Sequence, residues 1–266
     1  MVLGSTKAKL PGQAANFAAV AIAVLWPHLC DTTAMSNPSR QVPARDSYLS
    51  CYDKDSDKLV GPSTRRTVVL ESSDGKYRVY AESEAVTHKK RAAQPGEYVE
   101  CENRSALFVA GPQNRQFRQV MSMLPRPDLS GSSISLVDWF RQGHRLSIGG
   151  GVWGYASDFG GIEIRIYDAD SATLSSESFV DEAFRKYVGK DCIGVYQPKG
   201  FSDDGGIVVK AGPYFEEGEE QPQPDSCLAK EGNWLIGPAR DAIRQLPDDY
   251  IPRHYGKEVP VNLLRK

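Results

Sequence analysis

Short apolar runs separated by polar turns dominate the chain from about residue 65 to residue 250. At Ile162, Ile164 and Ile166 the isoleucines alternate with polar or amphipathic residues, which places all three on one face of a strand. Runs of this kind, bounded by glycine, aspartate or asparagine, are typical of β-strands. They occur at residues 68–70, 77–81, 106–110, 117–121, 134–139, 145–148, 162–167, 192–196, 207–210, 234–236 and 242–246. The pattern therefore predicts an all-β protein.

Helical patterns are few. Residues 178–187 predict a short helix, with Phe179, Phe184 and Tyr187 loosely spaced along it. Residues 238–245 fit a turn or two of helix equally well, and this competes with the strand predicted at residues 242–246.

The strands group into three units of similar layout. Each unit has a strand, a tight turn, a strand, an insert, a strand, a turn and a last strand. The turns contain Gly75, Gly143 and Gly205, which are 68 and 62 residues apart. Four antiparallel strands form a sheet that cannot bury both of its faces alone, so the units must pack on one another. The units cover roughly residues 65–125, 130–180 and 190–250.

The turn segments resemble a known repeat. LVDWFRQGHRL at residues 136–146 is similar to the W-S-P-D-G-x-x-[IL] signature of TolB-type, WD40-like β-propeller repeats, as is FSDDGGI at residues 201–207. SSDGKY at residues 72–77 is a weaker copy. IRIYDAD at residues 164–170 resembles the third strand and turn of such blades, and GNWLI at residues 232–236 stands at the matching place in the last unit.

The resemblance implies three four-stranded antiparallel blade-like repeats in a partial or atypical β-propeller. Closed propellers have at least four blades, and only three units are visible here. The competing prediction is a β-sandwich with long inserts. Around the repeat domain, residues 37–64 are expected to be an irregular lead-in and residues 251–266 a C-terminal tail.

Composition and charge narrow the class of protein. The chain has 266 residues, with 32 Lys and Arg against 34 Asp and Glu. This balance argues against a dedicated nucleic-acid binder, which shows a basic excess. An apolar content of 40% is enough for a packed core and excludes wholesale disorder.

The N-terminus has the pattern of a secretory signal peptide. Lys7 and Lys9 precede an apolar stretch at residues 14–26, and small residues follow at Ala34 and Ser36. We expect residues 1–36 to be cleaved and the protein to be secreted or periplasmic. The apolar run is shorter than the roughly 20 residues that a transmembrane helix needs. No transmembrane segment is therefore expected in the mature chain.

Two alternatives to cleavage stay open. Cys30 could carry a lipid anchor, although Leu29 stands where a lipoprotein signal usually has a small residue. The apolar stretch could also remain as an uncleaved anchor.

Cleavage would leave four cysteines, namely Cys51, Cys101, Cys192 and Cys227. An even number in an exported chain predicts two disulfides. Their equivalent places in the first and third units favour Cys51–Cys101 and Cys192–Cys227. A zinc site is the rival, but the chain has no C-x-x-C pair. Buried free thiols are a further alternative.

A glycine- and aromatic-rich insert is predicted at residues 149–161. Its Trp153, Tyr155 and Phe159 could form a stacking surface for sugar or peptide, with Asp158 as a hydrogen-bond acceptor. Alternatively, the rings pack onto the edge of the blade and the glycines permit the bend.

Evidence for catalysis or metal binding is weak. The acidic run at residues 53–57 begins like a calcium loop, but Lys58 and Thr64 occupy positions that need Gly and Glu. No G-x-S-x-G motif is present, and His144 is expected to be solvated in its turn. We therefore expect no catalytic residue, metal or cofactor.

Taken together, the sequence predicts an exported, non-catalytic β-scaffold that binds an unknown protein or cell-envelope component. The alternative function is a carbohydrate-binding or carbohydrate-active module that uses the insert at residues 149–161.

Overall fold

The structure is a computed structural model. It describes residues 45–50, 61–91, 97–125, 131–154, 160–188, 196–212, 225–237 and 242–259. The chain divides into two units, Met1–Gln41 and Val42–Lys266, and all described residues belong to the second.

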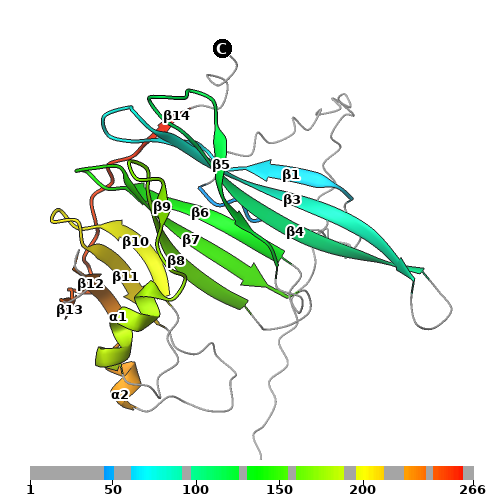
Figure 1. Cartoon of the computed structure of the whole chain (residues 1–266). Helices are drawn as coiled ribbons and strands as arrows, with labels where there is room; N and C mark the ends of the chain where they lie inside the picture. Colours follow the sequence, from blue (N-terminus) through cyan, green and yellow to red (C-terminus); the bar gives the residue numbers. More distant parts are fainter. Residues whose placement is uncertain are drawn as a thin grey trace, which may run out of the picture. The chain divides into compact units, whose positions relative to one another are not determined.

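The described residues form three antiparallel sheets (Figure 1). The first contains β1 (Ser63–Arg66), β2 (Val69–Glu71), β3 (Arg78–Arg91), β4 (Glu97–Ala110), β5 (Arg118–Met123) and β14 (Lys257–Val259). The second contains β6 (Gly131–Trp139), β7 (Arg145–Trp153), β8 (Gly160–Asp168) and β9 (Thr173–Leu174). The third contains β10 (Tyr196–Phe201), β11 (Ile207–Ala211), β12 (Gly232–Ile236) and β13 (Ile243–Gln245). Two short helices, α1 (Phe179–Val188) and α2 (Asp225–Leu228), accompany them.

The mainly β character and the three antiparallel sheets are confirmed. The helix predicted at residues 178–187 is α1, and the segment at residues 243–245 is strand β13 rather than helix. The second and third sheets have the predicted four strands. The first has six, because β1 and β2 both pair with β3 and β14 pairs with β2. The strand predicted at residues 192–196, the first of the third unit, is described only from Tyr196, where β10 begins.

Two of the predicted inserts are strands instead. Residues 82–91 and 97–105, expected to be a polar insert, extend β3 and β4 into a long hairpin. Residues 149–153 and 160–161, expected to belong to the glycine-rich insert, complete β7 and begin β8. Glycine weakens a strand but does not prevent one where neighbouring strands supply the hydrogen bonds on both sides.

The second sheet contributes to two hydrophobic cores. On one face, Leu146 and Ile148 pack with Leu70 and Leu107 of the first sheet. On the other face, Ile164 packs with residues of α1 and of the third sheet, including Phe184, Val209 and Trp234. Successive residues of a strand point to opposite faces, so one sheet can serve both cores. Each sheet thereby covers a face that its neighbour would leave exposed to water.

Each sheet has its predicted tight turn. Gly75, Gly143 and Gly205 have φ values of +73°, +79° and +85°, a region that residues with a Cβ rarely adopt. The first and third turns also share their hydrogen bonds. The N–H of Gly75 donates to the carbonyl of Ser72, and that of Gly205 to the carbonyl of Ser202, at 2.9 and 3.0 Å. In both turns the serine hydroxyl also donates to the aspartate two residues later.

The segment predicted as a C-terminal tail contributes to the fold. Residues 247–256, the C-terminal strap, follow β13 of the third sheet and lead to β14 of the first. The strap contacts the second sheet on the way, because the carboxylate of Asp138 accepts the backbone N–H groups of Tyr255 and Gly256. The strap therefore connects all three sheets.

Candidate functional site

A groove of about 1150 Å³ is lined by the second sheet, the third sheet and the C-terminal strap. On the second sheet the lining includes small residues, Ser133 and Ser135 on β6 and Gly149 and Gly151 on β7, beside Leu136, Val137 and Ile162. Larger side chains of the lining include Ile162, Lys199, Lys210, Asp248, Ile251 and His254. The groove is large enough for more than a small metabolite, since ligand pockets commonly measure about 300–1,000 Å³.

Two glycines of the groove lie where a side chain would be crowded, Gly149 against the third sheet and Gly151 against its own sheet. A Cβ added to Gly149 would lie 3.2 Å from Cγ of Pro198 on β10, and one added to Gly151 would lie 3.0 Å from the hydroxyl of Ser133. Side chains at these positions would push the third sheet away or fill the groove. The glycine-rich sequence thus shapes the groove through its strands, not through an insert.

The groove has apolar and charged sites side by side. Ile162 is 45% exposed and Ile251 is 81% exposed, so both offer apolar surface to a partner. Lys199 and Lys210 stand on the third sheet, and Asp248 on the strap. A groove lined by exposed apolar side chains and by charges of both signs suits a peptide segment better than a strongly charged ligand.

Of the four predicted ligand-binding residues, only Trp153 is described. Its ring centroid lies 4.8 Å from that of Tyr48, and the side chain is half-buried. A Cβ on Gly131 would come within 2.4 Å of the indole, which shows how closely the ring packs on the edge of β6. Trp153 does not line the groove. Tyr155, Asp158 and Phe159 lie outside the described residues.

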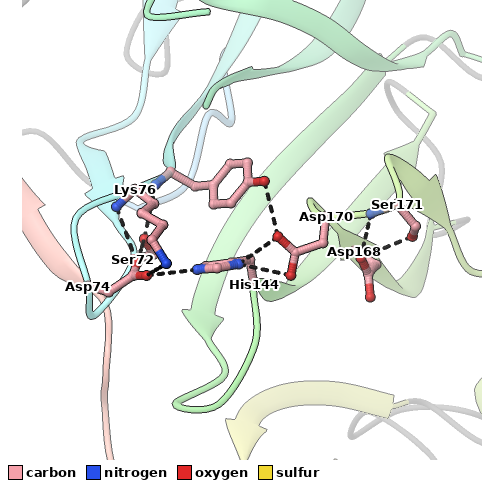
Figure 2. Close-up of polar contacts among 8 residues, drawn as sticks. Ser72, Asp74, Lys76, His144, Asp168, Asp170 and Ser171 are labelled. Atoms are coloured by element: carbon pink, nitrogen blue, oxygen red, sulfur yellow. Dashed lines mark hydrogen bonds and ion pairs between the residues drawn. The ribbon is translucent and has the colours of Figure 1, made fainter. Parts of the chain in front are cut away.

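A polar junction joins the first and second sheets (Figure 2). His144, in the turn between β6 and β7, lies between two carboxylates. Its Nδ1 is 2.7 and 2.9 Å from the two oxygens of Asp170, and its Nε2 is 3.0 Å from Oδ2 of Asp74. Lys76 pairs with Asp74 at 3.0 Å, and the hydroxyl of Tyr77 donates to Asp170 at 3.1 Å.

The contacts within the junction shift the pKa values of His144, Asp74 and Asp170. Burial of the His144 ring opposes its charge, but the hydrogen bonds with Asp74 and Asp170 outweigh burial and raise the pKa of His144. Burial likewise opposes the charge of Asp74, yet its bonds with His144 and Lys76 hold its pKa well below the usual range. The hydrogen bond from His144 also lowers the pKa of Asp170. All three groups are therefore favoured in their charged forms.

The expectation that His144 is solvated is wrong. Its side chain is 15% exposed, and both ring nitrogens face carboxylates. In this arrangement both ring nitrogens are engaged by carboxylates, and neither directs a lone pair at solvent. The sequence contained a signal for this junction, because Asp74 and Asp170 both stand in the repeat-like segments at residues 72–77 and 164–170.

A second junction joins the second and third sheets. The guanidinium of Arg145 lies 4.5 Å from the ring centroid of Phe140 and 5.7 Å from that of Phe201. It also donates to the carbonyl of Gly205 at 3.2 Å. Burial lowers the pKa of Arg145 from its ordinary value, although an arginine stays protonated throughout the accessible range. The turn between β6 and β7 is thus fixed to both neighbouring sheets, through His144 and Arg145.

The described residues contain no group of three or more His, Cys, Asp and Glu side chains placed to hold a metal ion. The acidic run at residues 53–57 lies outside them. Nor does the described part contain a helix long and apolar enough to cross a membrane. Cys101 and Cys227 are buried, whereas Cys51 and Cys192 lie outside the described residues, so the disulfide pairing stays a prediction.

Comparison of the chain with protein-family models, with curated proteins and with solved structures found no match.

Proposed function

We propose that this chain is a non-catalytic β-scaffold that binds an extended segment of a protein partner in the groove. The observation that carries the proposal is the groove itself. It has a lining of Ser and Gly on the second sheet, beside the exposed Ile162 and Ile251. Small side chains bring a bound segment close to the sheet, and the two isoleucines offer apolar contacts that a partner would cover.

The two junctions support a rigid scaffold. Contacts of His144 and Arg145 fix the central turn to both neighbours, and Asp138 fixes the strap that lines the groove. A binding surface held in place by such contacts loses little conformational entropy when a partner binds. The export predicted from residues 1–36 would put that partner outside the cytoplasm or in the cell envelope.

The likeness to propeller repeats is part of the same proposal. Three sheets with equivalent turn glycines fit an open stack of three blades, which the strap completes where further blades would stand. The carbohydrate function has less support, because the one described ring of its stacking surface, Trp153, packs against Tyr48.

Site-specific photo-crosslinking in the producing cells tests the proposal. A photoreactive amino acid replaces Ile162 or Ile251 in the groove, and Glu84, exposed on β3 of the first sheet, is the control position. We expect both groove positions to give an adduct of the same mass that the control does not give. Equal adducts at all three positions, or none at either groove position, would refute the proposal.

A groove-filling variant sharpens the test. Ser135→Phe places a ring among the small residues of the groove and should abolish the adduct at Ile251. Ser122→Phe, on the exposed face of β5, adds the same ring elsewhere and should leave the adduct unchanged. Circular dichroism of both variants separates a blocked groove from a lost fold.

A further inference from the structure

The contacts of His144 with two carboxylates require a proton on each of its ring nitrogens. A carboxylate only accepts hydrogen bonds, so each ring nitrogen that faces one must donate. His144 faces Asp170 with Nδ1 and Asp74 with Nε2, at 2.7 and 3.0 Å. A neutral imidazole has a single N–H and cannot serve both. Only the imidazolium, with an N–H on each nitrogen, satisfies both of the carboxylates that Figure 2 draws beside the ring.

We infer that His144 is a pH-dependent latch, whose imidazolium holds the first-sheet turn at Asp74 against the second sheet and whose loss of one proton releases that turn. The inference does not depend on the groove or on what binds there.

The geometry indicates which contact opens. Nδ1 meets both oxygens of Asp170, whereas Nε2 meets one oxygen of Asp74 at the longer distance of 3.0 Å. The backbone also keeps His144 beside β8, since its carbonyl accepts the N–H of Ala169 at 2.9 Å. The proton of the neutral ring therefore stays on Nδ1, and the lone pair of Nε2 then faces the carboxylate of Asp74.

The other charged groups of the junction do not replace the lost contact. On the first sheet, Lys76 is already paired with Asp74, and Tyr77 donates to Asp170 while its ring lies 4.6 Å from the imidazole. On the second sheet, Asp168 binds the backbone and hydroxyl of Ser171. Loss of the proton therefore opens one link between the sheets but leaves the Tyr77–Asp170 hydrogen bond intact.

The pKa shifts determine whether the latch opens in acid or in alkali. The pKa of His144 is raised from its ordinary value of about 6.5, so its contribution to stability is complete below that pH. The contribution is lost as the pH rises through the raised pKa. The carboxylates have lowered pKa values, so their contribution is complete above the ordinary carboxylate pKa and is lost as the pH falls through the lowered values. The latch is closed between these limits and opens on the alkaline side.

Nuclear magnetic resonance of the whole chain tests the latch. The imidazole signals are followed from pH 5 to pH 9, and those of His144 are assigned by their loss in His144→Gln. We expect His144 to titrate above an ordinary histidine, with the backbone signals of Asp74, Gly75 and Lys76 moving at the same midpoint. A midpoint at or below the ordinary value, or no coupled movement of the turn, would overturn the inference.

Two variants separate the latch from general effects of pH. Asp74→Asn should lower the titration midpoint of His144, because the ring loses one carboxylate while it keeps Asp170. His254→Gln replaces an exposed histidine near Asp138, and it should change neither the titration midpoint of His144 nor the backbone signals of the turn. In hydrogen exchange corrected for intrinsic rates, the amides of the turn should exchange several-fold faster at pH 9 than at pH 6 in the wild type. A wild-type turn with pH-independent exchange would equally overturn the inference.

Discussion

The carboxylate of Asp138 accepts the backbone N–H of Gly256 at 2.8 Å, although the two residues are 118 positions apart in the sequence. Its other oxygen accepts the N–H of Tyr255 at 2.7 Å. Asp138 is fully buried, and these two donors give its side-chain oxygens the hydrogen bonds that a buried polar group needs. The bonds fix the C-terminal strap to the second sheet just before β14 pairs with β2 of the first.

Asp138→Asn should weaken this attachment. An amide has one accepting oxygen, so its NH₂ group would face a backbone N–H and leave both without a partner. Unsatisfied buried groups of this kind cost about 1–3 kcal/mol. We expect a fall of that size in the free energy of unfolding, measured in urea, and faster hydrogen exchange in β14.

Asp249→Asn is the matched control, because Asp249 is exposed on the same strap. It should change the free energy of unfolding by less than about 0.5 kcal/mol, as surface substitutions usually do. Equal effects of the two variants would show that the buried carboxylate does not hold the strap.

The turn glycines Gly143 and Gly205 should respond differently to alanine. Both have positive φ, so Gly143→Ala should cost about 1 kcal/mol from backbone strain alone, because nothing lies within 4 Å of the added Cβ. At Gly205 the same Cβ would lie 2.6 Å from Nη2 of Arg145 and 2.7 Å from the ring of Phe140. Gly205→Ala should therefore cost a further 1–3 kcal/mol or so.

Urea unfolding of both variants measures this difference. Arg145→Ala would remove one of the two crowded neighbours, so the double variant Arg145→Ala/Gly205→Ala should be less unstable than the sum of its parts. Strict additivity would mean that Gly205 does not meet Arg145 as the structure has it.

Local signals were sufficient for much of the fold. Alternation at Ile162, Ile164 and Ile166 predicts β8, and the turn glycines predict the hairpins, because both depend on a few neighbouring residues. The antiparallel order of each sheet follows from such hairpins, which join strands that are neighbours in sequence.

The long hairpin of β3 and β4 was missed for a physical reason. Its inward face contains buried polar residues, with Ser83 and Asn103 fully buried and Ser105 nearly so. The hydroxyl of Ser83 binds those of Ser47 and Ser105, and the amide of Asn103 donates to the carbonyl of Leu49. The outward residues are polar because they meet water. Polar residues therefore occur on both faces of this hairpin, and the alternation of apolar and polar residues that indicates a strand is absent from its sequence.

The site was harder to predict than the fold. Its contacts join residues far apart in the chain, such as His144 with Asp74 and Asp138 with Gly256. A single sequence gives residue types but not such distant partners. The same limit applies to the groove, because the contact of Gly149 with Pro198 joins two sheets and has no local signal in the sequence.

The buried serines give a third prediction. The hydroxyl of Ser83 donates a hydrogen bond to that of Ser47 at 2.8 Å, and it forms a second hydrogen bond with the hydroxyl of Ser105 at 2.7 Å. Ser83→Ala leaves these partners short of a hydrogen bond and should cost about 1–3 kcal/mol in urea. Ser122→Ala, on an exposed position of β5, should have almost no effect. Equal stability of the two variants would show that water or other groups satisfy the cluster.

The cysteines give the last prediction. Cys101 lies in β4 and Cys227 in α2, and both are buried. If the protein is exported and cleaved near Asn37, its intact mass should be about four hydrogens below the reduced value, because each of two disulfides removes two. Peptide mapping without reductant should join Cys51 to Cys101 and Cys192 to Cys227. A peptide joining Cys101 to Cys192, or four thiols that react freely with iodoacetamide in the unfolded chain, would contradict this pairing.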